Sequence, residues 1–295
     1  MFPPLVKPDW SREGRGWPNR ESSRFVSAGG LKWHVQILGD GPPLFLLHGA
    51  GAATHSWRDL APLLSRDFTV VAPDLPGHGF TETPKSDGLS LSGMVKALLG
   101  LLGALDLKPA LIVGHSAGAA IGMRLCLGGA APRGLVSLNG ALAPFPGAAG
   151  HVFPAMARLL FLNPLAIQTF AWRASRPGAV ARLIQGTGST IDAAGLHDYG
   201  RLFATTGHVA GALGMMAHWD LAPLVRDMRG FPRPLTLVSA ENDRAVHPKV
   251  ARGVAAIVPG SRVITLPGVG HLAHEESPEV AANIIREAAV WRSSD

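Results

Sequence analysis

A serine in a five-residue turn between a strand and a helix constrains this chain more than any other feature. The turn is Gly114-His115-Ser116-Ala117-Gly118. The apolar run 109–113 before it predicts a buried strand, and the run 119–126 after it has helical character. A turn this tight leaves no room for Cβ atoms beside the serine, which accounts for the two glycines. Such a turn can present the serine hydroxyl as a nucleophile, although small strand–helix turns are also a common structural device.

A serine hydroxyl is a weak nucleophile at neutral pH and needs a base, which in turn needs an orienting acid. Two further strand patterns, 234–240 and 261–266, run into loops that carry Asp243 and His271. Ser116, Asp243 and His271 therefore each follow a predicted strand, in the chain order typical of α/β-hydrolases. We predict that these three residues form a catalytic triad within an α/β-hydrolase fold.

Other residues compete for roles in this site. Glu241 lies in the same loop as the predicted acid, but less deep in it. Asn139 follows the strand after the serine turn, where some relatives carry the acid, and an amide cannot be the anionic partner. We expect His115 to pack away from the nucleophile, His274 to play a supporting or capping role, and Asp74 to brace its own loop.

A second Gly-rich turn, His48-Gly49-Ala50-Gly51, ends the short apolar run 44–47. Such a turn can aim a backbone N–H at a developing oxyanion, paired with the N–H of the residue after the serine. We therefore predict that Ala50 and Ala117 form the oxyanion hole. Position alone supports this assignment, because backbone donors leave no side-chain pattern.

Composition narrows the class of protein. A chain of 295 residues is long enough for one large α/β domain with an insertion. The sequence has no uninterrupted apolar run of roughly 18 residues and no signal-peptide core at its start, so we expect a cytoplasmic protein. With Cys126 as the only cysteine, an internal disulfide is ruled out.

The net charge is +6, from 27 basic and 21 acidic residues, and the basic residues are scattered rather than clustered. No nucleic-acid motif accompanies them, so we expect no nucleic-acid partner. Attraction to anionic lipid or to an anionic substrate is the more natural use of this charge, and plain solubility is the alternative.

The alternation of strands and helices stops after residue 139 and returns near residue 234, which divides the chain into parts. We expect residues 1–22 to form an irregular arm. Residues 23–142 and 220–295 predict a mostly parallel sheet with helices on both faces. Residues 143–219 are helical, apolar and interrupted by prolines. They predict a helical cap inserted over the carboxyl ends of the strands, where ligands bind in open α/β sheets.

Large apolar side chains in and near the cap are candidate substrate contacts. They are Trp57, Phe145, Phe161, Trp172, Met215, Met216 and Trp219. With several arginines nearby, they suit a large hydrophobic small molecule that bears carboxylates. Packing between cap and core is the commoner use of such residues, and contact with a membrane surface is a third interpretation. Neither a metal-ligand cluster nor a nucleotide-binding fingerprint is present, so we expect no metal and no cofactor.

From about residue 10 to 290 the chain resembles the magnesium-chelatase accessory proteins of bacteriochlorophyll biosynthesis. The discriminating segments are Trp17-Pro18-Asn19-Arg20, residues 139–151 and Phe161-Leu162-Asn163-Pro164. The resemblance implies a role near magnesium insertion into protoporphyrin IX, with chelatase subunits as partners, and it supplies no established reaction. Two functions stay open: a serine hydrolase acting on an ester-like carbonyl, and a porphyrin-binding or chelatase-assisting protein with an inherited triad.

Overall fold

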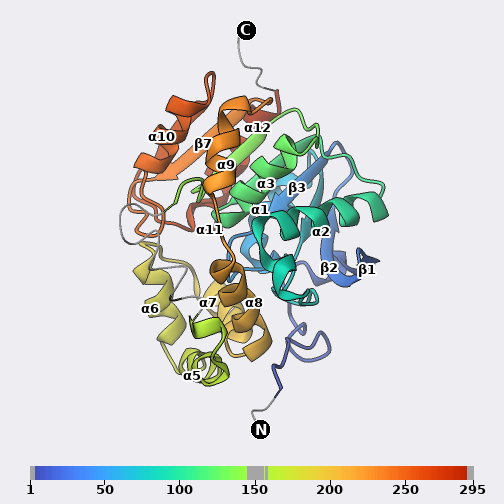
Figure 1. Cartoon of the computed structure of the whole chain (residues 1–295), viewed down its shortest axis with the longest axis vertical. Coiled ribbons are helices and arrows are strands. Elements are labelled where there is room, and N and C mark those ends of the chain that lie inside the picture. The colour runs from blue at the N-terminus through green and yellow to red at the C-terminus, as the bar shows by residue number, and fades with distance from the viewer. Residues whose placement is uncertain (1–3, 145–155, 157–158, 291–295) are drawn as a thin grey trace.

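The computed structural model describes residues 4–144, 156 and 159–290, and its core is built on one eight-stranded sheet (Figure 1). The strands are β1 (Ser23–Ala28), β2 (Leu31–Leu38), β3 (Pro43–Leu47), β4 (Thr69–Pro73), β5 (Leu111–His115), β6 (Leu135–Leu138), β7 (Leu235–Ala240) and β8 (Arg262–Leu266). Their order across the sheet is β1-β2-β4-β3-β5-β6-β7-β8.

The sheet is antiparallel only at its first edge. The pairs β1–β2 and β2–β4 are antiparallel, and every later pair from β4–β3 to β7–β8 is parallel. A hairpin with Gly29 and Gly30 at its turn joins β1 to β2, with Ala28 paired to Leu31. The predicted mostly parallel α/β sheet is confirmed. Because β5, β6, β7 and β8 are neighbours, the loops after them open at the same edge of the sheet.

Helices cover both faces of the sheet. They are α1 (Leu60–Leu64), α2 (Leu91–Ala104), α3 (Ala117–Leu127), α9 (Ala222–Asp227), α10 (Lys249–Ile257), α11 (Ala273–Glu276) and α12 (Pro278–Val290). Side chains alternate across β3: Phe45 and Leu47 pack with residues of α2, α3, α9 and α10, whereas Leu44 and Leu46 pack with residues of α1, α11 and α12. A strand buried on both faces reads as a continuous apolar run, as this one does.

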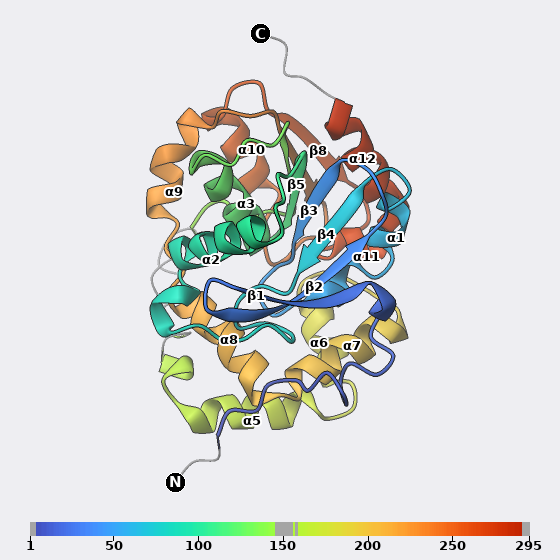
Figure 2. The ribbon, with the colours of Figure 1, turned by 90° about the vertical axis from the view of Figure 1, so that its right-hand side faces the viewer.

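Four helices form a layer outside the sheet, which we call the cap: α5 (Pro164–Ala174), α6 (Ala179–Gly186), α7 (Ala193–Phe203) and α8 (Thr206–Ala217). In Figures 1 and 2 they lie together at one end of the molecule, with α5 outermost. The cap has its own apolar cluster, which includes Ile167 and Tyr199 and extends to Ala52 and Leu272 of the core loops. No helix among the described residues is both long and apolar enough to cross a bilayer.

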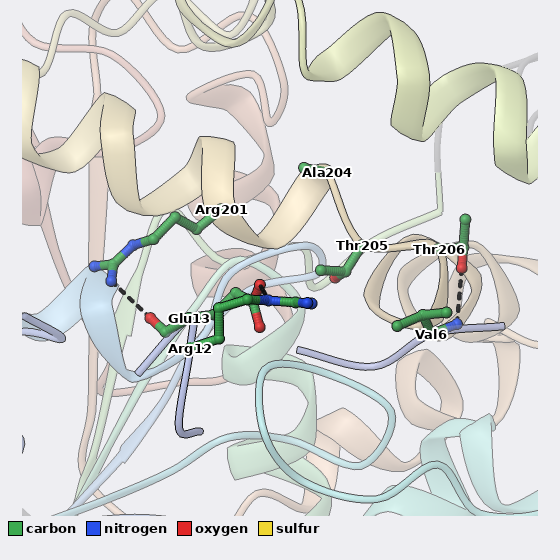
Figure 3. A pocket seen from close by; sticks show the side chains of 7 residues that line it. All are labelled: Val6, Arg12, Glu13, Arg201, Ala204, Thr205 and Thr206. Atoms are coloured by element: carbon green, nitrogen blue, oxygen red, sulfur yellow. Dashed lines mark hydrogen bonds and ion pairs between the residues drawn. The ribbon is translucent and has the colours of Figure 1, made fainter. Parts of the chain in front are cut away.

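The N-terminal segment, expected to be irregular, is held firmly between cap and core. Its one short 3₁₀ turn is Arg20–Ser22. Trp17 is buried, and its Nε1–H donates to Thr54 Oγ1 of the core at 2.9 Å. From the cap, Arg201 donates to the carbonyls of Glu13 and Arg15 at 2.6 and 2.7 Å. Figure 3 shows the hollow between this arm and the cap, whose lining contains no residue of the predicted triad.

Candidate active site

Ser116 stands alone between the end of β5 and the first residue of α3. Its backbone has φ +52° and ψ −118°, a conformation that costs a non-glycine residue about 1–3 kcal/mol. A Cβ at Gly114 would collide with the Gly118 carbonyl, and one at Gly118 would collide with the Leu47 carbonyl. The Ser116 N–H donates to Leu138 O of β6 at 3.0 Å. The backbone around Ser116 is therefore fixed by close packing, and the two glycines permit it.

Asp243 and His271 meet at the ends of β7 and β8. His271 Nδ1–H donates to Asp243 Oδ2 at 2.8 Å, and the Asn139 amide donates to the same oxygen at 2.8 Å. Asp243 Oδ1 accepts the N–H groups of Ala245 and Val246 at 2.8 and 2.7 Å. Burial acts to raise the pKa of Asp243, but these hydrogen bonds outweigh it and hold the pKa below its ordinary value. Asp243 is thus kept as a carboxylate that orients the His271 ring.

The hydrogen bond to Asp243 fixes the tautomer of His271. With its proton on Nδ1, the neutral ring carries its lone pair on Nε2, the atom that must accept a serine proton. Ser116 is half-buried and His271 is nearly buried. Within the described ranges no hydrogen bond joins Ser116 Oγ to His271. The acid and the base are paired, and the serine stands beside them.

His115 is buried and packs as expected, and it also links the serine turn to His271. Its Nε2–H donates to the His271 carbonyl at 2.9 Å, and the two rings lie 4.8 Å apart. The His274 ring lies on it at 4.4 Å. Burial lowers the pKa of His115 to about 3, and the neighbouring His271 adds to this effect. The neutral ring therefore holds the His271 backbone next to the nucleophile turn.

The loop after β3 passes directly over Ser116, because a Cβ at Gly49 would lie 3.0 Å from the Ser116 Cβ. His48 Nδ1–H donates to the Gly49 carbonyl at 2.8 Å, and His48 Nε2 accepts the Leu75 N–H at 2.8 Å. The carbonyl of one residue and the N–H of the next point in opposite directions across a trans peptide. Fixing the Gly49 carbonyl on His48 therefore turns the Ala50 N–H the other way, as an oxyanion donor requires.

The second predicted donor, the N–H of Ala117, opens α3. The first N–H groups of a helix have no partner within it and carry partial positive charge. No described residue accepts a hydrogen bond from the N–H of Ala50 or Ala117. Both donors are therefore free for a ligand within the part of the chain that the structure describes.

A buried polar network supports α11, the helix that follows His271. Glu275 accepts hydrogen bonds from Ser56 at 2.6 Å and Tyr199 at 2.8 Å, and it pairs with Arg58. Ser56 also bonds His274 Nε2 at 2.8 Å. This network joins the core loop after β3, the cap helix α7 and α11. The supporting role expected of His274 matches its position here.

The competing acids lie elsewhere. Glu241 is exposed, and no hydrogen bond joins it to His271 among the described residues. Asp74 is fully buried and accepts the N–H groups of Thr54 at 2.7 Å and Phe80 at 2.9 Å, so it braces two loops as expected. The described residues contain no group of three or more His, Cys, Asp or Glu side chains placed to hold a metal ion.

The predicted substrate contacts divide into three groups. Trp57 and Met215 are buried in the apolar core and have no surface to offer a ligand, so the prediction was wrong for them. Trp172 is also misassigned, because it lies exposed on the outside of α5. The role stays a prediction for the partly buried residues Phe161, Met216 and Trp219. Phe145 lies outside the described residues.

The sequence of this chain matches a family model described as the alpha/beta hydrolase family over residues 44–284. The chain belongs to the alpha/beta hydrolase family. The match covers most of the core together with the cap, and it includes every residue of the predicted triad and oxyanion hole. Members of this fold place a nucleophile after β5 and its base after the last strand, which is where Ser116 and His271 lie in this alpha/beta hydrolase.

Individual relatives of this alpha/beta hydrolase are of two kinds. It is 38% identical to the magnesium-chelatase 30 kDa subunit of Rhodobacter capsulatus, over 91% of this chain and 95% of that protein. It is 38% identical to a 2-hydroxy-6-oxo-2,4-heptadienoate hydrolase of Pseudomonas putida, over 37% of this chain and 41% of that protein. The resemblance to magnesium-chelatase accessory proteins is thereby confirmed.

Solved structures that are similar to this alpha/beta hydrolase have the same fold. The enol-lactonase from Burkholderia xenovorans LB400 superposes with a TM-score of 0.73 at 21% identity, covering 91% of this chain and all of that one. At this identity the likeness supports the fold alone, and the chemistry must be argued from the site.

Proposed function

We propose that this alpha/beta hydrolase is a serine hydrolase that cleaves an ester-like carbonyl bond in a hydrophobic small molecule. The observation that carries the proposal is the 2.8 Å hydrogen bond from His271 Nδ1 to Asp243 Oδ2, made beside the strained turn of Ser116. A protein that used the turn only as a structural device would not need a paired acid and base at that edge of the sheet.

In the proposed reaction, Ser116 Oγ attacks the carbonyl carbon while His271 Nε2 takes the hydroxyl proton. The N–H groups of Ala50 and Ala117 stabilise the tetrahedral oxyanion. His271 then gives its proton to the leaving oxygen, the scissile bond breaks, and an acyl group remains on Ser116. A water molecule, deprotonated by His271, releases the acid by the same steps in reverse. Asp243 stays a carboxylate throughout and stabilises the imidazolium.

As the substrate, we propose a porphyrin-like molecule that is processed in association with magnesium chelatase. The chelatase subunits would be the protein partners. Similarity to the Rhodobacter capsulatus magnesium-chelatase subunit supports this association with the chelatase. The partly buried Phe161, Met216 and Trp219 would contact the apolar part of such a molecule. Contact with a membrane is a separate proposal, taken up below.

A fluorophosphonate probe tests the chemistry, because it labels only an activated serine. We expect the wild-type protein to be labelled and Ser116→Ala to lose all labelling. His271→Ala should lower the labelling rate by a factor of ~10⁴. Ser92→Ala, an exposed serine on α2, serves as the matched control and should label like the wild type. A folded wild-type protein that resists the probe would refute the hydrolase mechanism.

The name of the Rhodobacter capsulatus relative favours a second candidate, in which the chain assists the chelatase without catalysis. Pigment formation in a phototrophic host separates the two functions when the host's own copy is replaced by Ser116→Ala at matched protein level. A fall in bacteriochlorophyll with build-up of a precursor supports the hydrolase. Wild-type pigment from Ser116→Ala, together with a loss on deletion of the gene, supports the assisting role.

A further inference from the structure

We propose that the outer surface of α5 and α6 docks on a membrane that carries anionic lipids. We call this surface the outer cap face. It consists of Leu159, Leu162, Leu165, Trp172, Arg173, Arg176, Arg182 and Leu183. The proposal does not depend on the serine hydrolase function, because none of these residues belongs to the catalytic site.

Helix α5 has two opposite stripes. Ile167 and Ala171 are buried in the cap cluster, at the four-residue spacing of one helix face. Leu165 and Trp172, seven residues apart, lie on the opposite stripe and are 53% and 58% exposed. A surface helix normally presents polar residues to water. Helix α5 instead exposes an apolar stripe in addition to the apolar stripe that packs in the cap.

The neighbouring segments also carry exposed apolar side chains. On α6 the buried positions are Val180 and Ile184, whereas Leu183 is 43% exposed. In the segment before α5, Leu159 and Leu162 are 70% and 66% exposed. Single exposed apolar residues are ordinary, but a group this concentrated marks a contact surface. Figures 1 and 2 show α5 at the end of the molecule farthest from the sheet.

The charges on this face have one sign. Arg173, Arg176 and Arg182 are exposed, and the Arg176 guanidinium stacks 4.0 Å over the Trp172 ring. The sequence has no Asp or Glu from residue 107 to residue 191. Exposed Trp and Leu flanked by arginines is the composition of helices that lie in a bilayer interface, with the rings among the acyl chains and the cations at anionic headgroups.

Charge also argues against the simplest alternative, a second copy of the chain. A two-fold dimer would place this face against itself, because both subunits use the same patch. Three arginines would then meet three arginines with no acid of the face between them. An anionic lipid surface supplies the opposite charge as well as the apolar medium. We therefore assign the lipid surface as the occupant.

Vesicle flotation tests the proposal with the full chain. At low salt we expect the protein to float with phosphatidylcholine vesicles that contain phosphatidylglycerol, and not with pure phosphatidylcholine vesicles. At about 1 kcal/mol for each basic residue near an anionic surface, the triple variant R173Q/R176Q/R182Q should bind about a hundredfold more weakly. The matched control R66Q/R229Q/R252Q removes three exposed arginines elsewhere and should bind much more tightly than the cap variant.

A double variant, Leu165→Glu with Trp172→Glu, tests the apolar part of the outer cap face. The control is the double variant Leu99→Glu with Val280→Glu, which changes exposed apolar residues on two other helices. We expect only the cap pair to abolish flotation, with an unchanged circular dichroism spectrum and fluorophosphonate labelling. No binding of the wild type at low salt would overturn the proposal. Equal loss in both charge variants would overturn it as well, because binding would then follow net charge alone. A wild-type dimer that only the cap pair dissociates would reassign the face to self-association.

Discussion

Asn139 gives the carboxylate of the proposed catalytic acid, Asp243, a second side-chain hydrogen bond. Its amide donates to the oxygen of Asp243 that also accepts from His271. The residue reaches this position at the end of β6 with φ +48°, in the left-handed region that Asn tolerates better than most residues. The Asn139 amide, at the end of β6, thus helps to hold Asp243 in place. Strand β6 lies between β5, which precedes Ser116, and β7, which precedes Asp243.

Replacing Asn139 with Gly keeps the positive φ accessible and removes only the amide. A hydrogen bond to a charged group contributes about 1.5–3 kcal/mol, so we expect fluorophosphonate labelling of Ser116 to slow by roughly tenfold or more. The lost donor should also raise the pKa of Asp243. Asn242→Gly is the control, since Asn242 is exposed and adjacent in the chain. Equal rates for the two variants would mean that Asn139 does not orient the acid.

His48 offers a second prediction for a single residue. His48→Ala removes one of the two hydrogen bonds to the Gly49 carbonyl and leaves only the one from the Ala52 N–H at 3.2 Å, so the direction of the Ala50 N–H is less well fixed. We expect kcat to fall by up to the 10²–10³-fold that loss of an oxyanion donor costs, with KM little changed. Affinity for a boronic acid that mimics the oxyanion should fall by a similar factor. His218→Ala, at the end of α8, should leave both values unaltered; an unaffected boronic acid affinity in His48→Ala would contradict the assignment.

At the scale of elements, the local sequence pattern was enough to predict most helices and strands of the core. The pattern of residues 91–105 predicts a helix, and the structure has one at Leu91–Ala104. The strand and the helix that flank Ser116 also lie where the sequence predicts them. The pattern of residues 57–64 predicts one helix as well, but the structure has a 3₁₀ turn, Thr54–Trp57, followed by the short helix Leu60–Leu64. A sequence pattern shows that a segment is apolar, but it does not show which residues its side chains contact. For this reason Trp57 and Met215 were predicted to contact a substrate.

The partners of His115 and Asn139 could not be predicted for a different reason. Their hydrogen bonds span 156 and 104 residues of sequence. Such contacts depend on how the loops after four neighbouring strands converge, and that convergence is a property of the assembled sheet. The sequence indicated the three residues of the proposed triad, because each follows its own strand. It did not indicate which residues hold them in place.

At the scale of the whole molecule, buried histidines make stability depend on pH. Burial lowers the pKa of His48, His55, His78, His115, His208 and His274, in two cases to about 3. An unfolded chain keeps the ordinary value of 6.5 and binds more protons below it. Stability is therefore complete above that value and falls as the pH decreases toward 3, by about 1.4 kcal/mol per pH unit for each histidine.

We expect Tm to decrease steeply between pH 7 and pH 4.5. Glu275 opposes this trend, because burial raises its pKa, but it is one group against several. His115→Gln keeps a donor for the His271 carbonyl and cannot become charged, so its Tm should depend less on pH than that of the wild type. Tm values that stay constant across this range would contradict the neutral state of the buried histidines.

The N-terminal arm has a consequence for how the chain assembles. Its contacts are with the loop after β3 through Trp17 and Thr54, with β2 through Gln36 and the Pro18 carbonyl, and with α7 through Arg201. These sites come together only when sheet and cap have both formed. The arm is the first part of the described chain to be synthesised, yet it cannot complete its contacts until Arg201, almost two hundred positions later, has reached its place.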